Sequence, residues 1–291
     1  MENIAKNKKS FSNRLMRSIR TNSIFYLIII VMFAFLLFPI YWMIVSSFKE
    51  NNVLFTLPPE FLPVNPTLVN YKSIFVDNIF VTYYKNSLFV SFGATALTMF
   101  VATFCGYAFS RFNYKLNEII ITLILSASMF PVVSQLISIY GIFKNNGLLN
   151  NHYALMMILT SVSLPFCILM IRSYFNDIPK ELDEAAKIDG CGRMRTMFQI
   201  ILPLVKPGLL AVAIYTFMRA WDDYQYGLTL INRDEMRTLG PGISLRFLGD
   251  VQFDWGKTLS VAVAASLPVL LIFMFLQKYM VSGLTAGAVK G

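Results

Sequence analysis

The sequence predicts an all-α membrane protein with six transmembrane helices and a further helical segment outside the bilayer. Hydrophobic residues make up 56% of the 291 residues and charged residues only 14%. Soluble domains have about 45–50% apolar and about 25% charged residues, because water must solvate their surfaces. Long uncharged runs alternate with shorter charged segments along the chain. Together these observations exclude a soluble enzyme, a disordered segment and a nucleic-acid-binding protein, although the net charge is +9.

Six apolar runs are expected to cross the membrane, since a helix needs about 20 residues to span the hydrocarbon. Five of them contain no charged residue: 24–45, 86–110, 119–143, 153–171 and 259–277. The sixth, 207–221, is shorter and contains Arg219, so it must extend into one of its flanks. We include it because an even number places both termini on the same side. Pro131 and Pro268 lie inside spans and are expected to kink them.

Basic residues predict the orientation. With the N-terminus in the cytoplasm, the inner segments carry sixteen Lys and Arg and the outer segments eight, as the positive-inside rule requires. The first apolar run is longer than the apolar region of a signal peptide, which has about 7–15 residues, and no A-x-A-like cleavage site follows it, so we expect a retained anchor. The expected organisation is a cytoplasmic N-terminal segment 1–22, a first transmembrane helix 23–46, an extracytoplasmic loop 47–85, a five-helix core 86–280 with an inner loop 172–206, and a cytoplasmic tail 281–291.

The chain contains few residues of the types that catalyse reactions or bind metals. The chain has three cysteines without metal-ligand spacing and one histidine, His152, so we expect no metal site, no cofactor and no catalytic residue. The sequence contains no Gly-x-x-x-x-Gly-Lys loop that would bind ATP phosphates. An ion-coupled carrier would need carboxylates inside its spans, and the five uncharged runs have none. A self-sufficient transporter and a membrane enzyme are therefore the weaker hypotheses.

The inner loop 172–206 carries charges of both signs. We expect a helix with Asp177 as its N-cap, Pro179 in its first turn and Gly190 at its end. A second short helix is expected over 193–201, ended by Leu202-Pro203.

One face of the first loop helix is expected to be small. Leu182, Ala185, Ala186 and Asp189 recur at helical spacing, and charged residues such as Glu184 and Arg193 border them. Small side chains bury little area against lipid. The segment is therefore either an interfacial connector or a surface that another protein can approach closely.

Aromatic and amide side chains follow the fifth predicted span. Trp221, Tyr224 and Gln225 at its outer end, with Gln135 in the third span, could recognise a sugar through ring faces and hydroxyl-matching groups. The alternative is the ordinary interfacial aromatic belt, with Gln135 serving in helix–helix hydrogen bonding.

The inner loop resembles a known motif. Glu184-Ala185-Ala186, then Gly190 after three residues, then Ile200-x-Leu202-Pro203 after nine more match the EAA motif of permease subunits of binding-protein-dependent ABC importers. Further segments look like the carbohydrate branch (carbohydrate uptake transporter 1 family) and its maltose-type second permease: Asn70-Tyr71, Asn86-Ser87-Leu88, Trp221-Asp222-Asp223-Tyr224 and the tail 283–291.

This resemblance implies a MetI-like permease architecture in the bacterial cytoplasmic membrane. It implies that the following residues belong to a coupling helix that docks on an ATP-hydrolysing subunit: Glu184, Ala185, Ala186, Asp189, Gly190 and Arg193. The implied partners are a second homologous permease, two ATP-binding cassette subunits that bind the ATP, an extracytoplasmic solute-binding protein and membrane lipid, without nucleic acid. The implied function is ATP-driven import of a sugar or oligosaccharide. Import of a non-sugar solute by the same family is the alternative.

Overall fold

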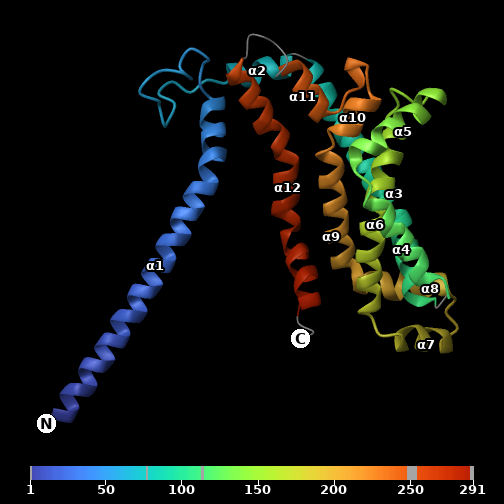
Figure 1. Ribbon diagram of the computed structural model, residues 1–291, viewed down its shortest axis with the longest axis horizontal. Coiled ribbons are helices and arrows are strands. Elements are labelled where there is room, and N and C mark those ends of the chain that lie inside the picture. Colours follow the sequence, from blue (N-terminus) through green and yellow to red (C-terminus); the bar gives the residue numbers. More distant parts are fainter. Residues whose placement is uncertain (1, 77, 113–114, 248–253, 289–291) are drawn as a thin grey trace. The chain divides into compact units, whose positions relative to one another are not determined.

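The chain folds into α-helices joined by short loops. The computed structural model describes residues 2–76, 78–112, 115–247 and 254–288, and among these residues it contains no β-strand (Figure 1). Two compact units are present: Met1–Lys72 with Asp254–Val263, and Ser73–Phe253 with Ala264–Gly291. The all-α class predicted from composition is confirmed.

Five helical stretches in the described part of the chain are long and apolar enough to cross a membrane. They lie in α1 (Glu2–Ser47), α3 (Asn78–Arg111), α6 (His152–Asn176), the continuous run Arg193–Trp221, and α12 (Trp255–Ala288). The shorter elements of the chain are α2 (Val69–Val76), α4 (Asn117–Ser128), α5 (Val132–Asn145), α7 (Glu181–Ile188), α10 (Gln225–Leu230), η2 (Asp234–Met236) and α11 (Leu239–Phe247). Each of the five stretches covers one predicted span.

The fifth predicted span gains its missing length from its N-terminal flank. α8 (Arg193–Thr196), the π-helical η1 (Met197–Ile201) and α9 (Leu202–Trp221) follow one another without a break. The expectation that Leu202-Pro203 ends a separate short helix is therefore wrong. Proline lacks a backbone N–H and fits the first turn of a helix. The π-turn directly before it joins the two helical segments.

The third predicted span is not one helix. α4 and α5 are bent by 92° at the break between them, so the expected kink at Pro131 is a full interruption. Pro131 itself is the N-cap of α5 and disfavours helical backbone at Phe130. The hydroxyls of Ser126 and Ser128 bond back to the carbonyls of Thr122 and Leu125 at 2.8 and 2.6 Å. Such bonds commonly bend helices, and here they occupy the last turns before the break.

Chain direction shows that α4 and α5 together make one crossing of the second unit. The first turns of α3 and α6 lie at the same end, since Tyr83 and His152 bond to Asp234 and Met236 of η2. Their last turns meet at the opposite end, where Ser110 Oγ lies 2.7 Å from Asn176 Oδ1. We call these the α10 end and the α7 end.

The bent pair must therefore return the chain from the α7 end to the α10 end. Glu118 of α4 pairs with Arg172 at the end of α6, at 3.0 Å. The amide of Asn150, after α5, donates to the carbonyl of Leu230 in α10 at 2.9 Å. The helices α3 and α6 run parallel, and with the bent pair counted as one span the described part of the chain has six candidate crossings.

In the first unit, a buried asparagine closes the loop that follows α1. Asn70 Nδ2 donates to the carbonyls of Ser47 and Lys49 at 3.0 and 2.7 Å. The Lys49 ammonium lies 4.7 Å from the centre of the Trp42 ring. Asn51 of the same loop donates to Asp254 at 2.6 Å. These contacts connect the end of α1 to the segment that begins α12.

Close packing of α3 on α6 forms the core of the second unit. A cluster of fully buried side chains at the α7 end includes Ala102, Ile171 and Phe175. Gly106 of α3 lets the helices approach: a Cβ there would lie 2.7 Å from Ile171 Cγ2 and 3.1 Å from the backbone nitrogen of Arg172. A small residue at this position therefore sets the helix–helix distance.

Gly106→Ala is expected to destabilise the protein by about 1–3 kcal/mol, because backbone atoms of α6 must move to admit one methyl group. Thermal unfolding of the purified protein in detergent measures the change. Gly141→Ala in α5 is the matched control, since no atom lies within 4 Å of the added carbon. Equal unfolding temperatures for the two variants would contradict this account of the contact.

Candidate functional site

The helix α7 is shorter at its start than the sequence suggests. It begins at Glu181 with Lys180 as N-cap, whereas Asp177 is the C-cap of α6. The amide of Asp177 still donates to the carbonyl of Ser173 at 3.1 Å, so this residue continues the preceding helix. The prediction of Asp177 as the N-cap of the loop helix is wrong, because α6 extends beyond the predicted apolar span.

The end of α7 is a Schellman motif. Gly190 adopts a φ of +78°, its amide donates to the Lys187 carbonyl at 3.1 Å, and the Cys191 amide donates to the Ala186 carbonyl at 2.8 Å. Asp189 is the C-cap. A left-handed backbone favours glycine at this position, as predicted. The turn reverses the chain before α8.

The residues of the predicted small face of α7 do not all point the same way: one is buried against the rest of the chain, and the others are exposed to solvent. Ala186 is buried, with 2% of its surface exposed. Glu184, Ala185 and Asp189 are exposed. Ile188, which the pattern did not single out, is 87% exposed. The outward face is therefore apolar at its centre, and it differs from the predicted one by losing Ala186 and gaining Ile188.

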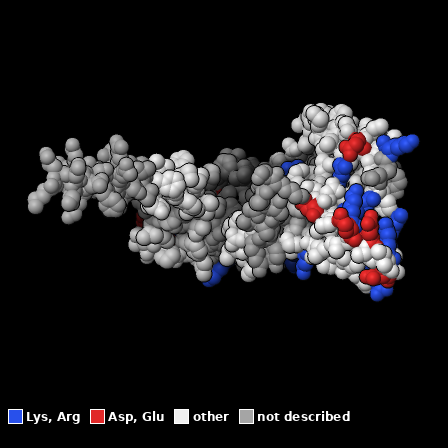
Figure 2. Space-filling view, turned by 90° about the horizontal axis from the view of Figure 1, so that it is seen from below, with Lys and Arg blue, Asp and Glu red and all other residues white. Residues whose placement is uncertain are grey.

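Charged side chains of both signs gather over α7 and α8 in the view of Figure 2. Arg193, predicted as part of the charged border, is exposed, and its guanidinium lies over the Phe112 ring at 4.7 Å. Cation–π contacts of this kind hold an arginine in place. Arg193 therefore fixes the start of α8 against the end of α3.

An ion pair holds the inward side of α7. Arg111, the last residue of α3, lies 2.8 Å from Asp183, and only 6% and 15% of the two side chains are exposed. The same guanidinium donates to the carbonyl of Ile178 at 3.1 Å. Neither Arg111 nor Asp183 is among the sequence-predicted site residues. The only available signal was a lone arginine at the end of an apolar run, next to a carboxylate within the motif.

A cavity of about 340 Å³ lies at the α10 end of the second unit. It is bordered by residues of α5, α6, α9, α10 and the turn between α9 and α10: Val132, Leu159, Val162, Ser163, Arg219, Ala220, Asp222, Asp223, Tyr224, Gln225 and Tyr226. The volume falls in the range of about 300–1,000 Å³ of small-molecule sites. Its lining combines aromatic rings, a guanidinium, carboxylates and an amide, which are groups that match hydroxyl-rich ligands.

Asp223 connects this cavity to α10. Its carboxylate accepts the backbone N–H groups of Gly227 at 2.8 Å and Tyr226 at 3.3 Å. Burial raises the pKa of the Asp223 carboxyl to about 6, although these two N–H groups and Arg219 act in the opposite direction. Asp223 therefore changes protonation near neutral pH while it caps the first turn of α10.

The family model for binding-protein-dependent transport system inner membrane components matches residues 97–285. The chain belongs to this family. It is a multi-pass permease component of a transport system, and the resemblance identified from the EAA motif is confirmed.

Named transport permeases from other organisms align with nearly the whole chain. It is 37% identical to the sulfoquinovosyl glycerol transport permease of Agrobacterium fabrum, over 88% of this chain and 89% of that one. It is 34% identical to the trehalose/maltose transport permease of Thermococcus litoralis, over 90% and 94%. A crystal structure of a bacterial ABC transporter that imports alginate contains a chain with the same fold, at a TM-score of 0.80 and 21% identity, over 90% and 98%.

The predicted pathway residues of the permease separate into two groups. Tyr224 and Gln225 border the cavity. Trp221 is buried, and its Nε1 donates to the Ala265 carbonyl at 3.3 Å. Gln135 Oε1 accepts the hydroxyl of Tyr226 at 3.1 Å, so it positions a lining residue. Aromatic spacing alone could not distinguish these roles.

Arg219 and Asp223 border the cavity but are not among the sequence-predicted pathway residues. Arg219 had been noted only as an obstacle to the fifth span. Its charge in an apolar run was the available signal, since such residues often border polar cavities. Among the described residues, no group of three or more His, Cys, Asp and Glu side chains could hold a metal ion.

Asp223→Asn is expected to remove part of the pH dependence of the permease's stability. The pKa of Asp223 is raised from 3.8 to about 6 in the folded state, so the protonated carboxyl stabilises the fold. This stabilisation is fully present at pH values below the unfolded-state pKa of 3.8. That stabilisation is lost as the pH rises through about 6. The wild type should lose about 1 kcal/mol between pH 5 and pH 7 relative to Asp223→Asn.

Thermal unfolding at both pH values measures this difference. Asp222→Asn, one residue earlier and exposed, is the control and should keep the wild-type pH dependence. An identical pH dependence in the wild type and Asp223→Asn would show that the carboxyl does not titrate in this range.

Proposed function

We propose that this permease is one of two homologous membrane subunits of an ATP-driven importer for a sugar or oligosaccharide. An extracytoplasmic solute-binding protein delivers the substrate. Two separate ATP-binding cassette subunits hydrolyse ATP, and this chain has no catalytic residue or cofactor of its own. The observation that carries the proposal is α7, a short capped helix in the EAA motif that is held on its inward side and exposed on its outward side.

The outward face of α7 suits protein contact better than lipid contact. Ile188 and Leu182 are 87% and 38% exposed, with Ala185 between them. The acidic Glu184 and the basic Lys187 border these residues and are exposed. A small apolar centre with a charged rim is typical of a protein interface. We assign this face to the cytoplasmic ATPase subunit, with Glu184, Ala185 and Asp189 in the contact.

Basic residues support a cytoplasmic position for the α7 end and for both termini. The segments assigned to the inside carry twice as many Lys and Arg as those assigned to the outside. The family description names an inner membrane component, in agreement with the bacterial cytoplasmic membrane. With this orientation, η2 and the cavity lie toward the outer face.

Sugar recognition is supported by the relatives and by the lining of the cavity. The named relatives transport a sulfoquinovosyl glycerol and trehalose or maltose. A sugar hydroxyl both donates and accepts hydrogen bonds, so it matches the amide of Gln225 and the guanidinium of Arg219. Tyr224 is 40% exposed, and its ring offers a face for a pyranose. We assign the cavity to the sugar pathway, with Trp221 and Gln135 as supporting residues.

Glu184→Lys is expected to reduce substrate-stimulated ATP hydrolysis by the assembled transporter at least tenfold, because it reverses a charge in the docking face. Membrane insertion should not change. ATPase assays on the reconstituted complex measure the effect, and co-purification of the ATPase subunit shows whether docking is lost. Glu181→Lys makes the same charge change on an exposed residue of the first turn of α7. It should keep most of the stimulation, and equal loss in both variants would count against a specific role for Glu184.

Gln225→Ala is expected to raise the KM of sugar uptake about three- to tenfold, as follows from the loss of about one hydrogen bond to substrate. Uptake of a radiolabelled sugar into proteoliposomes measures it. The control is Gln277→Ala, an exposed glutamine on α12 that does not border the cavity. An unchanged KM for Gln225→Ala would remove the cavity from the sugar pathway and leave the docking role of α7 untouched.

A further inference from the structure

We propose that α3 is a rigid link that carries displacements of α7 to the extracytoplasmic segment 234–247, which comprises η2 and α11. In this inference Arg111 and Asp183 are the positioning residues at one end of α3, and Tyr83 and Asp234 are those at the other. The inference rests on the proposed docking of α7. It adds the route by which docking reaches the opposite side of the membrane.

The inner end of α3 is attached to α7 by buried polar contacts. The Arg111 guanidinium pairs with Asp183 at 2.8 Å and also donates to the Ile178 carbonyl, which precedes α7. The Tyr107 hydroxyl, one turn earlier on α3, donates to the other carboxylate oxygen of Asp183 at 3.4 Å. A buried arginine that loses its carboxylate leaves an uncompensated charge. The pair therefore strongly opposes any separation of α7 from α3.

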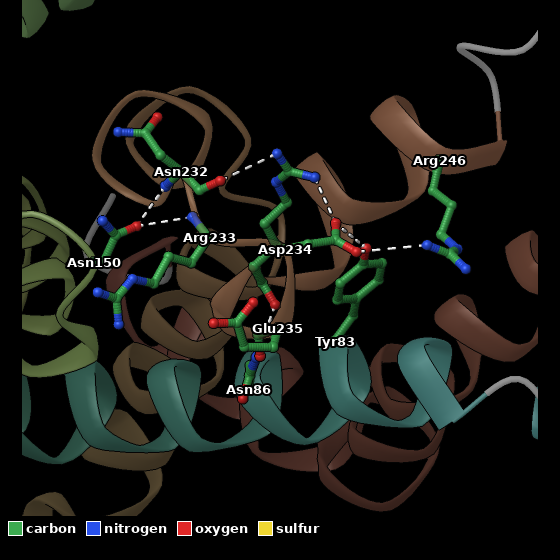
Figure 3. Close-up of polar contacts among 9 residues, drawn as sticks. Tyr83, Asn86, Asn150, Asn232, Arg233, Asp234, Glu235 and Arg246 are labelled. Atoms are coloured by element: carbon green, nitrogen blue, oxygen red, sulfur yellow. Dashed lines mark hydrogen bonds and ion pairs between the residues drawn. The ribbon is translucent and has the colours of Figure 1, made fainter.

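The outer end of α3 holds the segment 234–247 through Tyr83, Asn86 and Ser87, the first two of which are drawn in Figure 3. The Tyr83 hydroxyl donates to Asp234 at 2.6 Å. Asn86 Nδ2 donates to the carbonyls of Glu235 and Arg237 at 3.0 and 2.9 Å. Ser87 Oγ accepts the amide of Leu239 at 2.7 Å.

Two arginines pair with the Asp234 carboxylate, and one of them, Arg246, extends this attachment into α11. Arg237 pairs with Asp234 at 2.5 Å, and Arg246 pairs with the other oxygen of the same carboxylate at 3.5 Å. Asp234 therefore joins α3 through Tyr83 to the start and the end of the extracytoplasmic segment. One side chain connects three elements, so the segment is expected to follow the movement of α3.

Helix continuity distinguishes α3 from the other long helices. α1, α6, α9 and α12 each contain a proline, whereas α3 has none over its 34 residues. Proline removes a backbone hydrogen bond and favours a kink. At about 1.5 Å per residue, the distance along α3 from Tyr83 to Arg111 is about 42 Å. An uninterrupted helix of this length transmits a displacement with little bending.

α6 reaches the same two ends but is less suited to the task. His152 at its start bonds to the carbonyl of Met236, and its last residue, Asn176, lies shortly before α7. Pro165 interrupts its hydrogen bonding midway. Its link to α7 runs through the loop 177–180, whereas α3 holds α7 directly through Asp183. α3 is therefore the stiffer connection.

Hydrogen exchange in the complete transporter tests the inference. The permease, its partner subunits and the binding protein are reconstituted in nanodiscs. Amide exchange is then measured with and without AMP-PNP and Mg²⁺ in peptides 181–191 and 232–247. In the wild type, nucleotide should change exchange in both regions. In Arg111→Ala, the α7 response should persist, and the response of 232–247 should fall at least threefold.

The outcomes separate this inference from the proposed function. An unchanged response of 232–247 in Arg111→Ala would overturn the role of α3. Loss of both responses would also overturn it, since Arg111 would then act on docking alone. Absence of an α7 response in the wild type would contradict the docking role itself.

Further variants control for local unfolding. Glu118→Ala removes the Arg172 pair at the same end without touching α7, and both responses should remain. Asp234→Asn should weaken the outer response from the other end of α3 and leave the α7 response intact. The exchanged pair Arg111→Asp with Asp183→Arg should restore at least half of the lost response. Rescue would show that the ion pair between the two positions, and not either side chain alone, supports the response.

Discussion

The absence of water in the bilayer requires every backbone N–H and C=O group to find a partner within the protein. Continuous helices meet this requirement, and most of this permease consists of them. The break between α4 and α5 interrupts this hydrogen bonding, so other groups must satisfy the backbone groups that it leaves free. At the break between α4 and α5, Gln135 Nε2 donates to the carbonyl of Phe130 at 3.0 Å. The cavity of the second unit opens beside the first turn of α5.

The EAA segment shows how one short helix serves two surfaces. Neighbouring residues of the motif have opposite environments: Ala186 is buried and Ala185 is exposed. A methyl group is small enough to let α7 lie against its own chain on one side, and a partner can approach equally closely on the other. Asp183 supplies the polar attachment that alanine cannot. The motif therefore combines an anchored side with a free side.

Polar contacts in the second unit concentrate at its two ends, where the long helices are joined by loops and short helices. At the α10 end the carboxylates Asp223 and Asp234 each organise one short element, α10 and η2 respectively. At the α7 end Asp183 does the same for α7. Between these ends the packing is largely apolar, and small residues such as Gly106 determine how closely the helices approach. This division lets the ends exchange contacts while the interior stays intact.

Several features of the permease follow from the sequence by itself. Uncharged runs of sufficient length predicted five of the six crossings, since transfer of charges into hydrocarbon is strongly unfavourable, and the sixth, 207–221, was predicted although it is short and contains Arg219. Gly190 predicted the end of α7, because a left-handed residue after a helix favours glycine. The EAA spacing identified the family. These are local or compositional properties, and each depends on residues close together in the chain.

Only the tertiary structure decided which residues meet. It showed that Asp177 ends α6, that the third crossing is broken at Pro131, and that α9 continues through Pro203. It also paired Arg111 with Asp183 and placed Asp223 and Arg219 at one cavity. Arg111 and Asp183 are far apart in the sequence, and many helix packings would satisfy the same hydrophobic pattern. Burial and pairing energies select one packing among them, and a linear pattern does not contain that information.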